Sequence, residues 1–99
     1  MENIELQYNG SKTARNRALS GVVGSGDMEA LFEPDSGNTL AVTIITSVDG
    51  STPRWQRLFD RIFTTGSLPC GKLVIHDFGA TPGVARLRIE QVFEEASHD

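Results

Sequence analysis

The sequence has 99 residues, of which 38% are hydrophobic and 22% are charged, and its formal net charge is −4 at pH 7. This length fits one domain with a modest core, and the acidic balance disfavours nucleic-acid binding, which needs clustered Lys and Arg. The single cysteine, Cys70, excludes an intrachain disulfide. Because no apolar run approaches a membrane span and Met1-Glu2-Asn3 does not resemble a signal peptide, we expect one cytoplasmic domain over residues 1–99, without nucleic-acid or membrane partners.

The N-terminal half of the chain has the pattern of β-strands. Residues 4–8 alternate between apolar and polar side chains, as on a half-buried strand. Two further strands are expected over 17–23 and 28–33, with a turn at 24–27 between them. Residues 40–45 are rich in β-branched side chains and apolar enough to form a central strand.

The pattern then changes to a helical period. Residues 49–53 supply a turn, a candidate N-cap and Pro53, which suits the first turn of a helix. Gly66 is a plausible end for this helix. Its apolar stripe consists of Trp55, Leu58, Phe59, Ile62 and Phe63.

A strand over 72–78 and a second helix complete the predicted fold. Thr81 is the expected N-cap of that helix and Pro82 lies in its first turn. Its apolar stripe consists of Ala85, Ile89, Val92, Phe93 and Ala96. The order of elements predicts an α+β fold with two layers, in which two helices pack on one face of a mostly antiparallel sheet of four to five strands.

The segment Gly24-Ser25-Gly26-Asp27 stands out because a serine lies between two glycines at an expected hairpin tip. Such a tip projects the Ser25 hydroxyl into solvent, and the glycines leave room for a bulky enzyme to approach it. An acceptor serine for a phosphodiester needs this access and no local base. Taken alone, the pattern is more often simple turn chemistry.

Other chemistries fit the sequence poorly. A catalytic Ser25 would need a histidine oriented by an acid, yet Asp77 follows His76 on a strand and points to the opposite face. His98 lies near the chain end. Three Cys and His residues, widely separated, do not make a structural zinc site, and we predict no metal and no catalytic residue. The loop 79–83 opens a helix, and ordinary N-capping is its simplest interpretation.

Three longer segments carry a family resemblance: 21–27 around Ser25, 46–59 with Arg54-Trp55-Gln56, and 75–84, Ile-His-Asp-Phe-Gly-Ala-Thr-Pro-Gly-Val. Together they resemble the acyl carrier (delta) subunit of bacterial malonate decarboxylase, over almost the whole chain. The order of elements is also similar to that of the acyl carrier subunit of citrate lyase.

The resemblance implies a carrier role for Ser25. Its hydroxyl would hold a covalent prosthetic group, 2'-(5''-triphosphoribosyl)-3'-dephospho-coenzyme A, with Gly24, Gly26 and Asp27 beside the attachment point. The thiol of this arm would carry acetyl or malonyl as a thioester. The implied partners are the transferase and decarboxylase subunits of malonate decarboxylase and the prosthetic-group transferase. Some arginines are candidate contacts for partners or for phosphates of the arm, although solvent exposure is the simpler interpretation of each: Arg15, Arg17, Arg54, Arg57 and Arg61.

Two alternatives to a malonate decarboxylase carrier remain open at this point. One is a carrier of the citrate lyase type, and the other is an interaction module that is never modified and only scaffolds a complex. The segment 75–84 favours malonate decarboxylase over citrate lyase.

Overall fold

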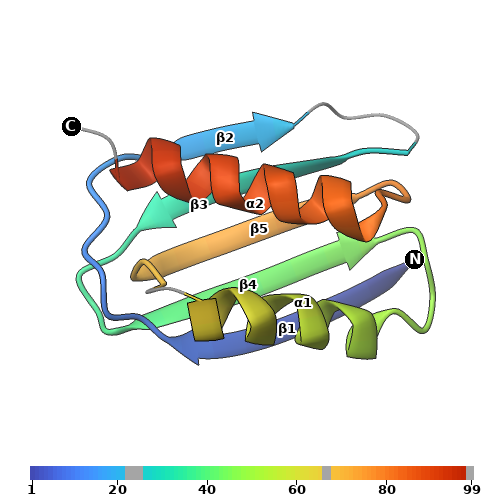
Figure 1. The fold of residues 1–99 in the computed structure, drawn as a ribbon, viewed down its shortest axis with the longest axis horizontal. Coiled ribbons are helices and arrows are strands. Elements are labelled where there is room, and N and C mark those ends of the chain that lie inside the picture. The colour runs from blue at the N-terminus through green and yellow to red at the C-terminus, as the bar shows by residue number, and fades with distance from the viewer. Residues whose placement is uncertain (22–25, 66–67, 98–99) are drawn as a thin grey trace.

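The computed structural model describes residues 1–21, 26–65 and 68–97 and confirms the two-layer α+β fold. The strands are β1 (Glu2–Asn9), β2 (Ala18–Gly21), β3 (Met28–Pro34), β4 (Thr39–Thr46) and β5 (Gly71–Asp77), and the helices are α1 (Thr52–Thr65) and α2 (Pro82–Ser97). Both helices lie on the same face of the sheet, α1 over β1 and β4, and α2 over β2 and β3 (Figure 1). No helix in the described part of the chain is long and apolar enough to cross a membrane.

The five strands follow the order β1-β4-β5-β3-β2. Three of the four pairings are antiparallel, and β4 with β5 is parallel because α1 carries the chain back between them. The strand predicted to be central, β4, is an interior strand, but the middle position belongs to β5. The sheet is therefore mostly antiparallel, as predicted, with one parallel crossover at its middle.

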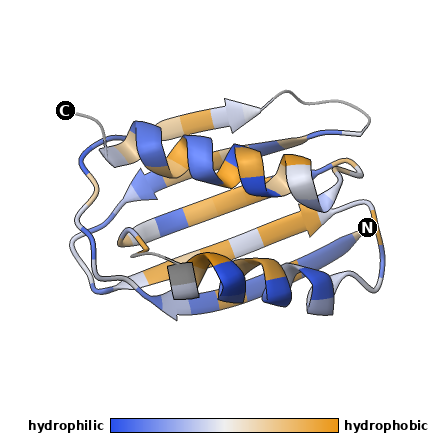
Figure 2. Ribbon diagram, viewed as in Figure 1, coloured by the Kyte–Doolittle hydropathy of each residue, from blue (hydrophilic) through white to orange (hydrophobic). Residues whose placement is uncertain are grey.

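The core lies between the sheet and the helices, where hydrophobic residues meet (Figure 2). On β4, alternate residues Leu40, Val42 and Ile44 are buried, since the side-chain period of a strand is two. The stripes predicted for both helices are largely confirmed. Phe63 is the exception, because 44% of it stays exposed near the end of α1.

The helix starts also match the sequence prediction. The backbone carbonyl of Ser51 accepts hydrogen bonds from the amides of Arg54 and Trp55, so α1 begins directly after Ser51. At α2, the Thr81 hydroxyl accepts a hydrogen bond from the Val84 amide at 3.3 Å, which is the expected N-cap. Gly66, the predicted end of α1, lies outside the described residues.

The segment 10–17, here called the strap, connects β1 to β2 from one edge of the sheet to the other. It runs along one end of the sheet, where the Cys70 amide donates to the Lys12 carbonyl at 2.9 Å. Farther on, the amides of Arg15 and Asn16 both donate to the carbonyl of Ala96 near the end of α2. The strap therefore joins both edges of the sheet and both layers.

Candidate functional site

The predicted attachment point lies between β2 and β3, the hairpin at the edge of the sheet. Ser25 and Gly24 lie outside the described residues, so the hairpin tip itself is not described. Gly26 and Asp27, the other two predicted site residues, are described and lead directly into β3. We call Gly26, Asp27 and Met28 the hairpin shoulder, because they hold the chain immediately after Ser25.

Backbone hydrogen bonds attach the hairpin shoulder to the neighbouring strand β5. The Gly26 amide donates to the Phe78 carbonyl at 2.8 Å, and the Phe78 amide donates to the Asp27 carbonyl at 2.9 Å. These bonds continue the β3–β5 ladder beyond the last strand residues, Met28 and Asp77. The residue next to Ser25 is thus fixed to the centre of the sheet through β5.

The side chain of Asp27 connects the shoulder to α2. Arg88 of α2 donates to both carboxylate oxygens, from Nε to Oδ1 at 3.2 Å and from Nη2 to Oδ2 at 2.9 Å. The Met28 amide also donates to Oδ1, at 2.7 Å. Such a two-point guanidinium–carboxylate pair fixes direction as well as distance. It joins the hairpin to α2, and Gln91 holds the other side of the guanidinium through a 3.3 Å bond from Nη1.

This pair changes the protonation behaviour of both side chains. The hydrogen bonds from Arg88, followed by the bond from the Met28 amide, hold the pKa of Asp27 below its ordinary value of 3.8. The hydrogen bond to Asp27 in turn raises the pKa of Arg88. Both side chains are 24% exposed, so solvent screens the pair in part. Asp27 is therefore an ionised anchor and not a candidate proton acceptor for the Ser25 hydroxyl.

A second carboxylate, Asp77, shapes the loop on which the shoulder rests. Its side chain is 1% exposed and accepts hydrogen bonds from the amides of Gly79 and Ala80 at 3.2 and 2.9 Å. The Thr46 hydroxyl donates to its other oxygen at 2.8 Å. These bonds fold the chain sharply after β5, where Gly79 has a φ of 94°. Asp77 thereby sets the position of the Phe78 carbonyl that receives the Gly26 amide.

The structure keeps His76 apart from this arrangement, as the alternation along β5 predicts. His76 lies half-exposed on the other face of the sheet, where its Nδ1 is 3.8 Å from Glu29. Asp77 is fully engaged by Thr46 and the loop amides, so it does not orient the imidazole. The other histidine, His98, lies outside the described residues.

Sequence reasoning did not assign a role to Arg88. It lies 61 residues from Asp27 in the chain, and nothing in the helical pattern distinguishes it from Arg86 two residues earlier. Only the packing of α2 over the β2–β3 hairpin brings it to Asp27. The Ser20 hydroxyl, which donates to the Arg88 carbonyl at 2.7 Å, fixes β2 to the same turn of α2.

Comparison with known proteins decides the family. The family model described as "Malonate decarboxylase delta subunit (MdcD)" matches residues 15–96. The chain belongs to the malonate decarboxylase delta-subunit family. This membership confirms the resemblance recognised in the sequence.

Relatives in this family match the chain from end to end. The malonate decarboxylase acyl carrier protein of Klebsiella pneumoniae is 61% identical, with 99% of each chain covered. The protein of the same name from Pseudomonas aeruginosa is 54% identical over the full length of both. A solved structure of a Pseudomonas malonate decarboxylase hetero-tetramer in complex with malonate contains a chain that is 50% identical, with a TM-score of 0.92 over 97% of this chain and 99% of that one.

Proposed function

We propose that the chain is the acyl carrier subunit of a malonate decarboxylase and that it carries a coenzyme-A-like arm on the hydroxyl of Ser25. The observation that carries this proposal is the end-to-end similarity to proteins named malonate decarboxylase acyl carrier protein, at 50–61% identity. When bound, the arm supplies a thiol that holds acetyl or malonyl as a thioester. The carrier would present this thioester to the transferase and decarboxylase subunits in the cytoplasm.

The surroundings of Ser25 fit an attachment point. Gly26 is exposed and has a φ of 79°, a conformation that favours glycine. Apart from its two chain neighbours, no atom of the described residues lies within 4 Å of the position a Cβ would take. Gly26 itself therefore places no side chain in the way of a modifying enzyme. At the same time, the bonds from Gly26 and Asp27 to β5 and α2 keep the flank in one place.

The charges near the shoulder also favour a carrier over a hydrolase. A nucleophilic serine needs a base within hydrogen-bond reach, but the Asp27 carboxylate is engaged by Arg88 and Asp77 is buried among its own donors. His76 lies on the opposite face of the sheet from these groups. The absence of such a base among the described residues supports a carrier whose chemistry comes from the arm and the partner subunits.

The test is the intact mass of the protein produced together with its modifying enzymes. We expect an excess of one prosthetic group over the sequence mass, which Ser25→Ala abolishes without unfolding the protein. Ser36→Ala is the matched control, because Ser36 precedes a glycine in the sequence as Ser25 does and is exposed, and this variant should keep the full adduct. An adduct that persists in Ser25→Ala would contradict the proposal.

The same preparation separates the alternatives. A scaffold module shows no adduct and assembles with its partners regardless of position 25. A citrate lyase carrier shows the adduct but restores activity to citrate lyase subunits and not to malonate decarboxylase subunits.

A further inference from the structure

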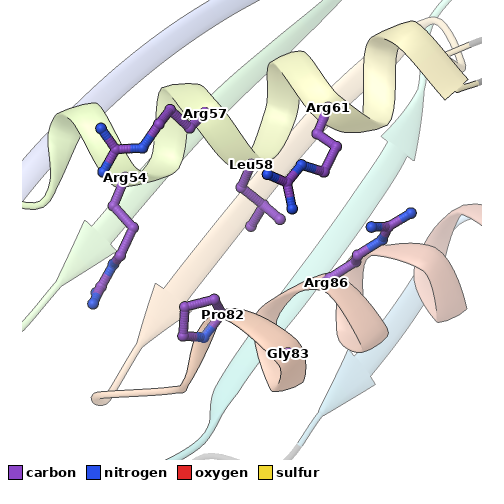
Figure 3. A pocket seen from close by; sticks show the side chains of 7 residues that line it. All are labelled: Arg54, Arg57, Leu58, Arg61, Pro82, Gly83 and Arg86. Carbon is purple, nitrogen blue, oxygen red and sulfur yellow. The ribbon is translucent and has the colours of Figure 1, made fainter.

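Four arginines line a groove between α1 and α2. This arginine groove has a volume of about 510 Å³, and its lining residues are Arg54, Arg57, Leu58, Arg61, Pro82, Gly83 and Arg86. Figure 3 shows Arg54 extending across the groove toward Pro82, while Arg61 and Arg86 come from opposite helices. It gathers four of the nine Lys and Arg residues of a chain whose net charge is −4. Such segregation of positive charge in an acidic protein is typical of a site for an anion.

The carboxylates near the arginine groove neutralise it only in part. Glu90 accepts a 2.7 Å hydrogen bond from Arg86, and Asp60 accepts from the Tyr8 hydroxyl on the β1 side of α1. Among the described residues, the structure records no carboxylate within ion-pair distance of the guanidinium groups of Arg54 and Arg57. Neither helix has an acidic residue in its first turn, so the positive N-terminal end of α2 at Pro82 and Gly83 adds to the field.

A small cavity of about 20 Å³ shares Arg54, Leu58 and Pro82 with the arginine groove and reaches Trp55. The indole Nε1–H of Trp55 is buried and has no hydrogen-bond acceptor among the described residues, although Trp55 is only 3% exposed. Burying such a donor without an acceptor is costly. The cavity has the size of a single oxygen-bearing group or water. The residue that holds this buried donor therefore lines the same small cavity as Arg54.

The arginine groove lies close to the hairpin that carries Ser25. The Gly26 amide bonds to the Phe78 carbonyl, and Pro82 follows Phe78 by four residues, a stretch that spans at most about 14 Å. A coenzyme-A-like arm bound to Ser25 covers this distance. Guanidinium groups bind phosphate oxygens through two parallel hydrogen bonds, and a volume of several hundred Å³ suits a nucleotide-sized group.

We propose that the arginine groove binds the phosphates of the arm attached to Ser25 when the arm is not in a partner's active site. This inference rests on the proposed function. The concave shape and small size favour a nucleotide-type group over an acidic surface of another protein. A free phosphate compound would accept the same hydrogen bonds from the arginines. Comparison of the loaded chain with the unmodified chain distinguishes this compound from the attached arm.

The first test uses the unmodified chain with pyrophosphate and dephospho-coenzyme A as probes. The fluorescence of Trp55, the chain's single tryptophan, should change on binding. Arg54→Gln with Arg57→Gln should weaken dephospho-coenzyme A binding by about tenfold or more, since each lost charged hydrogen bond is worth roughly that factor. Arg17→Gln with Lys72→Gln removes the same charge away from the groove and should change affinity by less than about twofold.

Three results would overturn the inference. These are no binding of either probe at millimolar concentration, equal weakening by both double variants, or stronger binding of a hexaglutamate peptide than of dephospho-coenzyme A, which would assign the groove to an acidic protein. None of these binding measurements requires an adduct on Ser25. Their failure is therefore distinguishable from failure of the mass experiment.

The second test compares the loaded and unmodified chains. If the attached arm occupies the groove, added dephospho-coenzyme A should bind the loaded chain more weakly. The factor should be one plus the effective concentration of the arm, about millimolar for a short flexible tether, divided by the Kd measured on the unmodified chain. Equal affinity of the two forms would overturn the assignment to the arm and would indicate a free phosphate compound instead.

Discussion

Asp27 is the residue on which the position of the hairpin depends most directly. Its carboxylate contacts the Met28 amide in the hairpin and Arg88 on α2, and its backbone carbonyl accepts a hydrogen bond from the Phe78 amide directly after β5. Both side chains of the pair with Arg88 are partly exposed, and such pairs contribute more to fixing the geometry than to net stability. We therefore assign Asp27 the role of orienting the chain after Ser25.

This role has a measurable pH dependence. Because the pKa of Asp27 in the folded chain lies below 3.8, its charged form stabilises the fold above that pH, and the contribution is lost as the pH falls through the lowered value. Carboxyl NMR titration should give a pKa below 3.8 for Asp27, and Arg88→Gln should move it upward. The Arg86→Gln variant is the control and should leave it unchanged. An unaltered Asp27 titration in Arg88→Gln would contradict the role.

At this scale the sequence predicts some features of the site and misses others. The two glycines around Ser25 are visible locally because turn chemistry depends on neighbouring residues. Pairs such as Asp27 with Arg88, or Asp77 with Thr46, join residues from distant segments, so no local pattern reveals them. The resemblance to a carrier family indicated that Asp27 is a site residue, but it did not indicate that the carboxylate pairs with Arg88.

The β2–β3 hairpin illustrates how one element depends on a single backbone conformation. Gly21 ends β2 with a φ of 98°, and a Cβ on it would overlap the carbonyl oxygen of Met28 across the hairpin. Both the backbone angle and the close approach require glycine at this position.

Gly21→Ala should therefore lower the free energy of unfolding by roughly 1–3 kcal/mol, the range for strained backbone positions, and loosen the hairpin. Denaturant unfolding measures the first effect, and amide hydrogen exchange across β2 and β3 measures the second. Gly83→Ala is the matched control, because Gly83 is helical and no described atom outside its chain neighbours and its own helix backbone lies within 4 Å of the added Cβ. Stability should therefore rise by about 0.5–1 kcal/mol. Equal effects of the two variants would contradict the argument.

The sequence pattern predicts where most strands and helices lie along the chain, but it does not predict how they are arranged in the sheet. The strands and helices appear where alternation, β-branched residues and N-caps place them, with bounds shifted by one or two residues in the described parts. The parallel pairing of β4 with β5 depends on how α1 returns across the sheet. That choice is made by packing of α1 against β1 and β4, which a single strand pattern does not encode.

On the scale of the whole molecule, the only cysteine is closed off from solvent. Cys70 is 8% exposed, and the strap covers it so closely that a Cβ on Gly10 would lie 2.7 Å from its sulfur. Reactivity of a thiol needs access as well as ionisation. The native chain should therefore be nearly inert toward thiol reagents.

We expect native Cys70 to react with a thiol reagent on the order of 100-fold more slowly than the same residue in urea-unfolded chain, because reaction has to wait for local opening. The Ser36→Cys variant supplies an exposed thiol for comparison. Without urea, this thiol should react as fast as Cys70 does in the unfolded chain. A native Cys70 that reacts as fast as this control would contradict the closure of the core around it.

The strap gives the molecule a mechanical property that matters to a carrier. Under the proposed function, a partner that draws the arm into its active site pulls on β2–β3, and β2 is a four-residue strand at the edge of the sheet. Such a strand would peel away easily if only its ladder to β3 resisted. The strap instead transmits the load to β1 at the far edge and, through the carbonyl of Ala96, to α2. The tension is thus shared across the domain and is not borne by the edge strand alone.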